Sequence, residues 1–307
     1  MKITEIGPNA LQVSTLCVGT SPLGSLPDTY GYAVDEARAV ATVERILESP
    51  INFLDTSNEY SQGESERRIG IALKRAGGAP DNFVIATKAD PAAGSRTFDR
   101  ERVLQSFRES AERLGVDTFG VYYLHDPERF PFEYLTGPDG ALSGMLELKE
   151  KGLVGAIGVA GGDITEMHRY VETGKFDILL NHNQYTLLDR SADALIDHAI
   201  AAGMDFVNAA PYASGILAKP AAAKPRFWYS VPSEAVIART ERIREICDRH
   251  GVSLPAVALQ FSTRDRRITS TVVGVSTPER VDELVENEQA TIPSEIWAEI
   301  DSVTTEQ

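Results

Sequence analysis

Eight short apolar runs, each separated from the next by a polar or amphipathic stretch, limit most strongly what this chain can fold into. They are rich in Val, Ile and aromatic residues, and most are continuously apolar, which is typical of strands covered on both faces. Amphipathic helix patterns lie between them, most clearly at 35–49, 99–115 and 191–203. The eight runs span residues 16–20, 52–56, 83–88, 119–125, 155–160, 177–183, 205–210 and 270–275.

Strands that alternate with helices over this length are typical of a (β/α)8 barrel, the TIM barrel, here expected to form a single domain over residues 1–307. The alternative is an open doubly wound sheet, which usually carries a G-x-G-x-x-G motif after its first strand. The first run is followed only by Gly19 and Gly24, which do not make that motif. The sequence therefore predicts the barrel.

Shorter sequence signals predict where individual helices, turns and loops begin and end. Asp99 and Ser191 are expected to be helix N-caps, and Gly115 and Gly203 are expected to end their helices. The first fifteen residues alternate around "GPNA", which predicts a short β-hairpin ahead of the barrel. Long loops are expected on the C-terminal face of the barrel, at 126–140 and 217–233, with a further helix from about Ser233 to His250.

Composition excludes several classes of protein. The net charge of −15 would repel phosphate backbones, so we expect no nucleic-acid partner. No segment approaches the roughly 18–20 continuous apolar residues of a membrane span, and the first residues lack the apolar centre of a signal peptide. We therefore expect a cytoplasmic protein with no membrane association. Cys17 and Cys247 lie in apolar patterns and predict buried, inert thiols rather than a disulfide.

Ionisable residues stand at the ends of three consecutive predicted strands. In a barrel of this type the C-terminal strand ends face one active site, which brings Asp55, Lys88 and His125 together, with Tyr60 in the loop just above them. A buried carboxylate needs a cation, and Lys88 is the candidate partner of Asp55. An adjacent ammonium is expected to lower the pKa of Tyr60, which suits proton exchange with a carbonyl or alcohol oxygen.

Each of these residues also has an ordinary structural interpretation. Asp55 would serve as a helix cap, Lys88 as half of a surface ion pair, and His125 as a hydrogen-bonded core histidine. The convergence of all four residues at one end of one barrel favours the catalytic interpretation. No metal site is expected.

Four segments resemble the aldo-keto reductases: "NFLDTSNEYSQGESERRIG" at 52–70, "ATK" at 86–88, "YYLHDPE" at 122–128 and "GAIGVA" at 155–160. The resemblance covers nearly the whole chain. It implies a TIM barrel that binds NAD or NADP without a Rossmann fold. It also implies a catalytic tetrad composed of Asp55, Tyr60, Lys88 and His125, in which Tyr60 is the general acid/base, Lys88 and Asp55 tune it, and His125 orients the substrate.

The resemblance also implies where the cofactor binds, and this chain departs from the family pattern there. Ala160 and Gly161 stand where many members have Ser-Asn, His182 replaces a Gln, and Ala209 replaces an aromatic residue that stacks on the nicotinamide. The family's adenine-contacting Asn would fall at Leu284, one helical turn before Asn287. The implied cofactor-binding residues are Gly19, Thr20, Ala160, His182, Ala210, Ser214, Gly215, Leu217, Gly274, Ser276, Thr277 and Arg280.

One departure bears on the choice of cofactor. Gly274 replaces a lysine that contacts the 2′-phosphate of NADP in many members, while Ser276, Thr277 and Arg280 remain. Loss of one charged phosphate contact removes about 1.5–3 kcal/mol. The sequence therefore favours NAD, or use of both cofactors.

Within the family, "NAAPYASGILA", "YTLLDR" and "HDPE" resemble the branch that contains D-threo-aldose 1-dehydrogenase, L-fucose and L-galactose dehydrogenases and pyridoxal 4-dehydrogenase. Oxidation of a cyclic hemiacetal, such as an aldose, to a lactone is the implied reaction. The alternatives are a pyridoxal dehydrogenase, a general NADPH-dependent reductase of aldehydes or ketones, and a non-catalytic regulatory subunit. Phe227, Trp228 and Tyr229 are candidates for lining the substrate pocket, or for pinning their loop to the barrel. The oligomeric state is left open.

Overall fold

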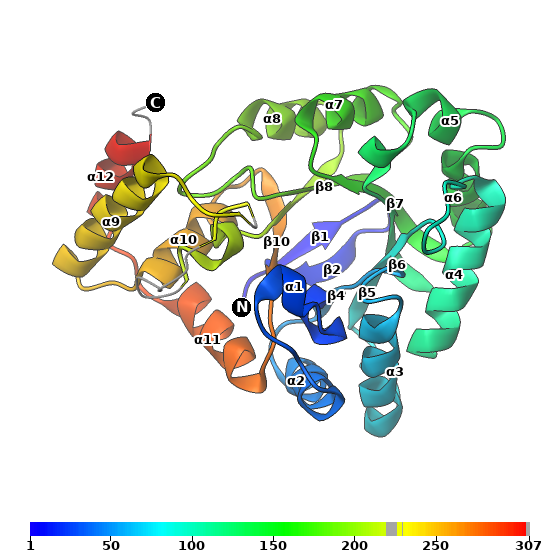
Figure 1. Ribbon diagram of the computed structural model, residues 1–307, viewed down its shortest axis with the longest axis horizontal. Coiled ribbons are helices and arrows are strands. Elements are labelled where there is room, and N and C mark those ends of the chain that lie inside the picture. Colours follow the sequence, from blue (N-terminus) through cyan, green and yellow to red (C-terminus); the bar gives the residue numbers. More distant parts are fainter. Residues whose placement is uncertain (219–225, 229, 305–307) are drawn as a thin grey trace.

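A computed structural model of the chain describes residues 1–218, 226–228 and 230–304. Eight parallel strands form a closed barrel in the order β10-β3-β4-β5-β6-β7-β8-β9 (Figure 1). This arrangement confirms the predicted TIM barrel. The strands are β3 (Leu16–Gly19), β4 (Phe53–Asp55), β5 (Val84–Ala89), β6 (Phe119–His125), β7 (Val154–Gly161), β8 (Ile178–His182), β9 (Asp205–Ala209) and β10 (Ile268–Gly274).

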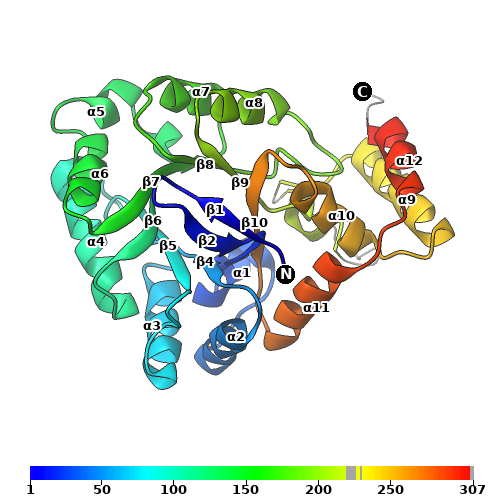
Figure 2. The ribbon, with the colours of Figure 1, turned by 180° about the vertical axis from the view of Figure 1, so that it is seen from behind.

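The predicted hairpin closes the N-terminal end of the barrel. Strands β1 (Ile3–Ile6) and β2 (Leu11–Ser14) pair antiparallel, with the GPNA segment as their turn. Figure 2 shows the hairpin lying across the barrel opening. Its turn is fastened there, because Gly7 N donates to Asp205 Oδ2 at 2.7 Å, at the start of β9. Ligands are therefore left with the opposite, C-terminal end.

Helices surround the barrel and bury their apolar faces against it. The described helices of nine or more residues are α2 (Glu36–Glu48), α3 (Glu64–Ala76), α4 (Arg100–Leu114), α6 (Ala141–Glu150), α7 (Ile164–Glu172), α8 (Asp193–Ala201), α9 (Glu234–Arg249), α10 (Leu254–Thr263), α11 (Pro278–Gln289) and α12 (Glu295–Thr304). Helices α9 and α12 lie side by side next to the barrel (Figure 1). None of the helices in the described ranges is long and apolar enough to span a membrane.

The local signals at helix ends are confirmed with one exception. Asp99 caps α4 by accepting a hydrogen bond from Arg102 N, and Gly115 ends that helix with a φ of 70°. Ser191 does not cap α8, which begins two residues later with Ala192 at the N-cap position. The reason is a local turn, in which the backbone N–H of Ser191 donates to the Asp189 carboxylate at 2.8 Å.

Two apolar layers make up the core, one inside the barrel and one between strands and helices. Cys17 belongs to the inner layer and Cys247 to the outer one, and both thiols are free and buried. Burial raises the pKa of the Cys17 thiol well above its usual value and that of Cys247 to about 11. The two cysteines are therefore inert, as the sequence predicts.

Three long connections build up the C-terminal face. The first holds the 3-10 turn η1 (Ser21–Gly24) and the short helix α1 (Pro27–Tyr30). The loop after β6 holds η2 (Pro127–Arg129) and α5 (Phe132–Thr136), and the loop after β9 holds η3 (Ala213–Gly215). Arg226 ties the first and third connections together, because its Nη1 donates to Thr29 O at 2.5 Å. These connections form the walls of the cavity described next.

Candidate active site

Asp55, Lys88 and His125 end or nearly end three adjacent strands, β4, β5 and β6, whose parallel pairing brings the three side chains together. Tyr60 lies in the turn between β4 and α3. All four residues line one cavity of about 1930 Å³ at the C-terminal end of the barrel. The structure thus assembles the four side chains that the sequence selects.

Lys88 is at the centre of this group. Its ammonium donates to Asp55 Oδ1 at 2.6 Å, to Thr56 O at 2.6 Å and to Tyr60 Oη at 3.0 Å. An ammonium group has three donors, so all three are used while the side chain is only 2% exposed. Because Tyr60 Oη accepts from Lys88, the phenolic proton is left to point elsewhere.

Burial sets the protonation of this half of the site. It raises the pKa of Asp55, and the charge of Lys88 and the hydrogen bond from its ammonium oppose that rise. Burial, followed by the charge of Asp55, raises the pKa of Tyr60 well above its ordinary value. The expectation that Lys88 lowers the Tyr60 pKa is thus not met, because removal of water and the nearby carboxylates outweigh the ammonium. The phenol is neutral in this site.

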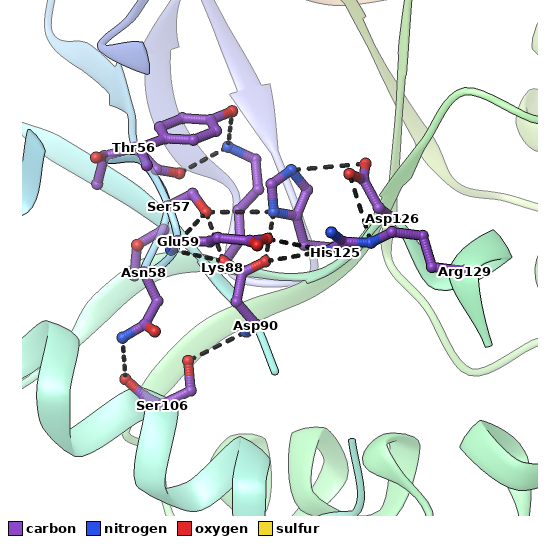
Figure 3. Close-up of polar contacts among 12 residues, drawn as sticks. Thr56, Ser57, Asn58, Glu59, Lys88, Asp90, Ser106, His125, Asp126 and Arg129 are labelled. Atoms are coloured by element: carbon purple, nitrogen blue, oxygen red, sulfur yellow. Dashed lines mark hydrogen bonds and ion pairs between the residues drawn. The ribbon is translucent and has the colours of Figure 1, made fainter. Parts of the chain in front are cut away.

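His125 is held by a carboxylate that the sequence analysis missed (Figure 3). Asp90 is fully buried, and its Oδ1 lies 2.7 Å from His125 Nδ1. Ser57 Oγ donates to the other oxygen of Asp90 at 2.5 Å and lies 3.2 Å from His125 Nδ1. The sequence signal was weak: Asp90 is two residues after Lys88, but it lies just past the end of β5, where the alternation of strand faces no longer places its side chain.

The charges on His125 and Asp90 reinforce each other. Burial disfavours the imidazolium, but the Asp90 carboxylate, with Asp126, raises the pKa of His125 overall. Burial likewise disfavours ionised Asp90, but the His125 charge and the hydrogen bonds from His125, Ser57 and Glu59 N keep its pKa below the usual value. Each charge therefore favours the other, and the pair favours an imidazolium beside a carboxylate.

A second cation borders this pair. Single ligating atoms of Glu59, Asp90 and His125 lie within 4.8 Å of one another, an arrangement that could hold a metal ion. Arg129 already brings positive charge there, because its Nη2 lies 3.0 Å from Glu59 Oε2 and 3.8 Å from Asp90 Oδ1. We therefore assign no metal to this cluster.

Small residues line the cavity opposite the tetrad, at the ends of the remaining strands. Gly19, Ala160, Ala209 and Gly274 leave room along the strand ends for a flat ring, and the cavity continues to Arg280 on α11. Its volume and lining fit a nicotinamide dinucleotide laid across the strand ends. Of the residues implied as cofactor contacts, those that line the cavity are Gly19, Ala160, His182, Ala210, Ser214, Gly215, Gly274, Ser276, Thr277 and Arg280.

Thr20 and Leu217 are not on the cavity wall. Both are fully buried, and Thr20 Oγ1 donates to Asp55 O at 2.9 Å, which braces the end of β4. The backbone N–H of Leu217 donates to Tyr212 O at 3.3 Å, as does that of Gly215 at 2.9 Å. The loop after β9 is thus a self-bonded turn, in which Ser214 has a φ of 60°. Direct contact with a cofactor is not supported for Thr20 or Leu217.

His182 presents a defined edge to the cavity. Asn183 Nδ2 lies 3.0 Å from His182 Nδ1, and the amide of Asn183 can only donate through this atom. Burial lowers the pKa of His182, with Asp126 opposing, so the ring is neutral and its proton is on Nε2. His182 can therefore replace the amide donor of a glutamine.

The far end of the cavity carries opposite charges. Arg280 Nη1 donates to Glu283 Oε2 at 2.7 Å, one turn further along α11, and both side chains are about half exposed, at 49% and 50%. Thr277 caps the helix by accepting from Arg280 N. Leu284 and Asn287 also line this end. Glu283 was missed by the sequence analysis, although its i,i+3 spacing from Arg280 is a recognisable ion-pair signal.

Neither Phe227 nor Trp228, two of the three aromatic residues predicted for the substrate pocket, lines the cavity. Phe227 and Trp228 are half-buried; the Trp228 ring lies 6.3 Å from that of His182, with a φ of 50°, while Tyr229 lies outside the described residues. Tyr30 and Tyr32 line the cavity instead, from the first connection. The "DTYGY" segment follows no predicted strand directly, so the strand-end pattern does not point to it.

Comparisons with known proteins agree with this geometry. Residues 15–305 match the profile of the Aldo/keto reductase family. Pyridoxal 4-dehydrogenase of Microbacterium luteolum is 30% identical, covering 97% of this chain and 96% of that enzyme. D-threo-aldose 1-dehydrogenase of a Pseudomonas species is 29% identical, covering 94% of each chain. A solved aldo-keto reductase from Bacillus halodurans, in its holo form, shares the fold with a TM-score of 0.80 at 23% identity, covering 99% of this chain and 96% of that one.

Proposed function

The chain belongs to the aldo/keto reductase family and is an NAD(P)-dependent oxidoreductase, and we propose that it interconverts a small cyclic hemiacetal and its lactone, preferentially with NAD. The observation that carries the proposal is Lys88, whose ammonium bonds Asp55 and Tyr60 at the wall of a large cavity. We also propose that residues 1–307 act as one domain.

Tyr60 exchanges the proton with the substrate oxygen. Its Oη accepts from Lys88, so its own proton is free to donate into the cavity. In the reductive direction the neutral phenol donates directly to a carbonyl oxygen. In the oxidative direction Tyr60 must first lose that proton, and because its pKa is raised, this step becomes favourable only as the pH rises.

Asp55 orients Lys88, while His125 supplies a second donor to the same substrate oxygen. The Tyr60 and His125 rings meet edge to face with centroids 5.7 Å apart, so both polar atoms serve one region of the cavity. Two donors on one oxygen stabilise the negative charge that develops there during hydride transfer.

The cofactor would be held by the small residues and the loop that line the cavity beyond the tetrad. When bound, the nicotinamide ring exchanges a hydride with the substrate carbon. His182, through Nε2–H, is suited to bind the carboxamide oxygen. NAD is favoured because Gly274 offers no cation and Arg280 is already paired with Glu283, whose carboxylate would repel a 2′-phosphate.

A hydroxylated substrate is favoured by the cavity lining. Tyr30 and Tyr32 offer aromatic faces to the apolar side of a ring, while Glu59, Asp126 and Arg129 offer polar contacts to hydroxyl groups. The related enzymes named above act, by their names, on an aldose and on pyridoxal, and both classes of compound combine a ring with hydroxyl groups.

Reduction of a small aldehyde with NADH is the second candidate. Its support is the direction of two pKa shifts, both upward, which favour a neutral Tyr60 and a charged His125. In these forms both side chains can donate to a carbonyl oxygen. An NADH-specific methylglyoxal reductase of Escherichia coli is 26% identical, covering 93% of each chain.

Turnover of a substrate panel tests these proposals. Aldoses, pyridoxal, their lactones and simple aldehydes are to be assayed with the oxidised and reduced forms of both cofactors. We expect NAD-linked oxidation of at least one aldose or of pyridoxal. Cofactor binding without turnover of any compound would contradict an enzymatic role and support a regulatory one.

A further inference from the structure

One fully buried carboxylate stands outside the four-residue group described above but is bonded to it through His125. Asp90 follows β5 directly and has 0% exposure, yet it accepts hydrogen bonds from three directions. Its Oδ1 bonds His125 Nδ1 at 2.7 Å, and its Oδ2 accepts from Ser57 Oγ at 2.5 Å and from Glu59 N at 3.1 Å. Hydrogen bonds from this many partners hold the buried carboxylate in one defined position.

The positions of the protons follow from these contacts. A carboxylate has no proton to give, so the bond between Asp90 and His125 is donated by Nδ1–H. The single Ser57 proton is directed at Asp90, which leaves Ser57 Oγ as an acceptor facing His125 Nδ1 at 3.2 Å. Nε2 is then the ring nitrogen that faces the cavity, 3.7 Å from Asp126 Oδ1.

The backbone around Asp90 is fixed as firmly as its side chain. Asp90 N donates to Ser106 Oγ of α4 at 3.2 Å (Figure 3). Asp90 O accepts from Arg102 Nε, also on α4, at 2.8 Å. Arg102 in turn makes hydrogen bonds to Glu109 of 2.6 and 3.0 Å. The carboxylate is therefore carried by a strand end that is bonded to a helix on its outer side.

We propose that Asp90 is a positioning residue which, together with Ser57, holds His125 as an imidazolium with Nδ1–H on the carboxylate and Nε2–H directed at the substrate oxygen. The inference rests on the proposed function, because it specifies the form in which His125 meets the substrate. Two consequences follow: the imidazole cannot rotate to offer its other nitrogen, and its charge is present before substrate binds.

Other charged groups also lie around the imidazole of His125, but none of them takes over the role of Asp90 in holding it. Lys88 and Arg129 oppose an imidazolium, while Glu59 is neutralised by Arg129 at 3.0 Å. Asp126 is a third exposed and lies beyond hydrogen-bond distance of Nε2. The titratable and charged groups around His125 are Asp55, Glu59, Tyr60, Lys88, Asp90, Asp126, Arg129 and His182.

The wild-type protein provides the first test. The chain has five histidines, few enough for the ring nitrogens to be resolved by ¹⁵N NMR, with His125→Gln to assign the His125 signals. At pH 7 we expect both nitrogens of His125 to be protonated. A neutral His125 with a bare Nδ1 would overturn the proposal without any variant of Asp90.

Two variants then separate charge from geometry. Asp90→Asn keeps the size of the side chain but removes its charge, so the titration of His125 should move to lower pH by about one unit or more. We expect kcat to fall at least tenfold with KM nearly unchanged. Reductive turnover should also begin to decline at a lower pH, by the same number of pH units as the His125 titration moves. Ser57→Ala keeps the charge, so it should move the titration less and lower kcat by a smaller factor.

Glu299→Gln is the matched control. It removes a carboxylate that contacts another histidine at the same distance, His250 Nε2 at 2.7 Å, outside the cavity. Turnover and the His125 titration should both stay at wild-type values. An Asp90→Asn protein with an unshifted His125 titration, or with a shifted titration and unchanged kcat, would overturn the proposal. Absence of wild-type turnover on the whole panel, with His125 shifted as expected, would instead overturn the proposed function.

Discussion

The two sides of the cavity are built in opposite ways. At the ends of β4, β5 and β6 the functional side chains are charged, almost fully buried and bonded to one another, as Lys88 is to Asp55 and His125 is to Asp90. At the ends of β7 to β10 and β3 the lining is mostly Gly and Ala, and the ion pair beyond them, Arg280–Glu283, is half exposed to solvent.

This difference places the proton-transfer chemistry on the buried side of the cavity and the selectivity for the cofactor on the open side. On the buried side each charged group depends on its partners, because a buried charge without a partner is not solvated by water. On the open side a side chain can change at small cost, because its neighbours are solvent or small residues. Substitutions on the buried side should therefore have large effects on activity and stability, and those on the open side should mainly redirect cofactor preference.

Tyr60→Phe should have the largest effect. It removes the proton-exchanging hydroxyl and should lower turnover by about 10²- to 10⁴-fold, while binding of the cofactor, on the open side, stays nearly unchanged. Steady-state turnover and fluorescence titration of the cofactor measure the two quantities.

Tyr170→Phe is the control for this change. It removes another buried phenolic hydroxyl, one that has no hydrogen-bond partner among the described residues, and it should leave turnover intact. If Tyr60→Phe retains more than a tenth of wild-type turnover, Tyr60 is not the general acid/base.

Lys88→Met should destabilise the fold more than Tyr60→Phe or any substitution on the open side. Removal of one partner of a buried ion pair costs about 3–5 kcal/mol of unfolding free energy. Burial already raises the Asp55 pKa, and loss of Lys88 removes the main opposition to that rise. The folded state then holds a proton that the unfolded state releases, so the loss of stability should be greatest at pH 8 and shrink as the pH falls toward 5.

Urea unfolding of Lys88→Met at both pH values measures this prediction. The control is Lys151→Met, which removes an exposed lysine paired with Glu147 and should change stability by less than about 1 kcal/mol at either pH. An equal loss at pH 5 and pH 8 would show that the destabilisation does not come from Asp55.

The same contrast explains what the sequence predicted. The barrel and the three strand-end residues Asp55, Lys88 and His125 were recoverable because burial forces continuous apolar strands, and because each ionisable residue stands alone at the end of such a run. Asp90 lies just past the end of its strand, in a loop-like "ADPAAG" segment, so its burial could be recognised only once α4 was packed against it. Tyr30 and Tyr32 reach the cavity through the path of a connection, which no local pattern encodes.

Gly274→Lys should shift cofactor preference by roughly tenfold toward NADP+, the worth of one exposed charged contact. The substitution is sterically permitted, because a Cβ at Gly274 would meet only Pro22, at 3.4 and 3.7 Å. Fluorescence titrations of NAD+ and NADP+ at matched ionic strength provide the measurement. A wild type that binds NADP+ a hundred times more tightly than NAD+ would show that Ser276, Thr277 and Arg280 suffice for the phosphate.

Glu283→Gln should have the smallest effect and is the sharpest test of the open side. It keeps the size of the side chain but removes the charge that pairs with Arg280, which frees the guanidinium for a 2′-phosphate. An exposed pair of this kind is worth about 0.2–1 kcal/mol, so NADP+ should bind about 1.5- to 5-fold more tightly, with NAD+ affinity unchanged. Because the pair is exposed, the gain should fade as the salt concentration rises.

Glu279→Gln distinguishes a local pairing from a general change of charge. It removes the same charge from the first turn of α11, whereas the structure pairs Arg280 with Glu283. If both variants strengthen NADP+ binding equally, the effect comes from the net charge of the helix and not from release of Arg280. A gain confined to Glu283→Gln, combined with the gain from Gly274→Lys, would mean that cofactor preference is set by two solvent-exposed positions. The buried side would then keep its chemistry whichever cofactor is bound.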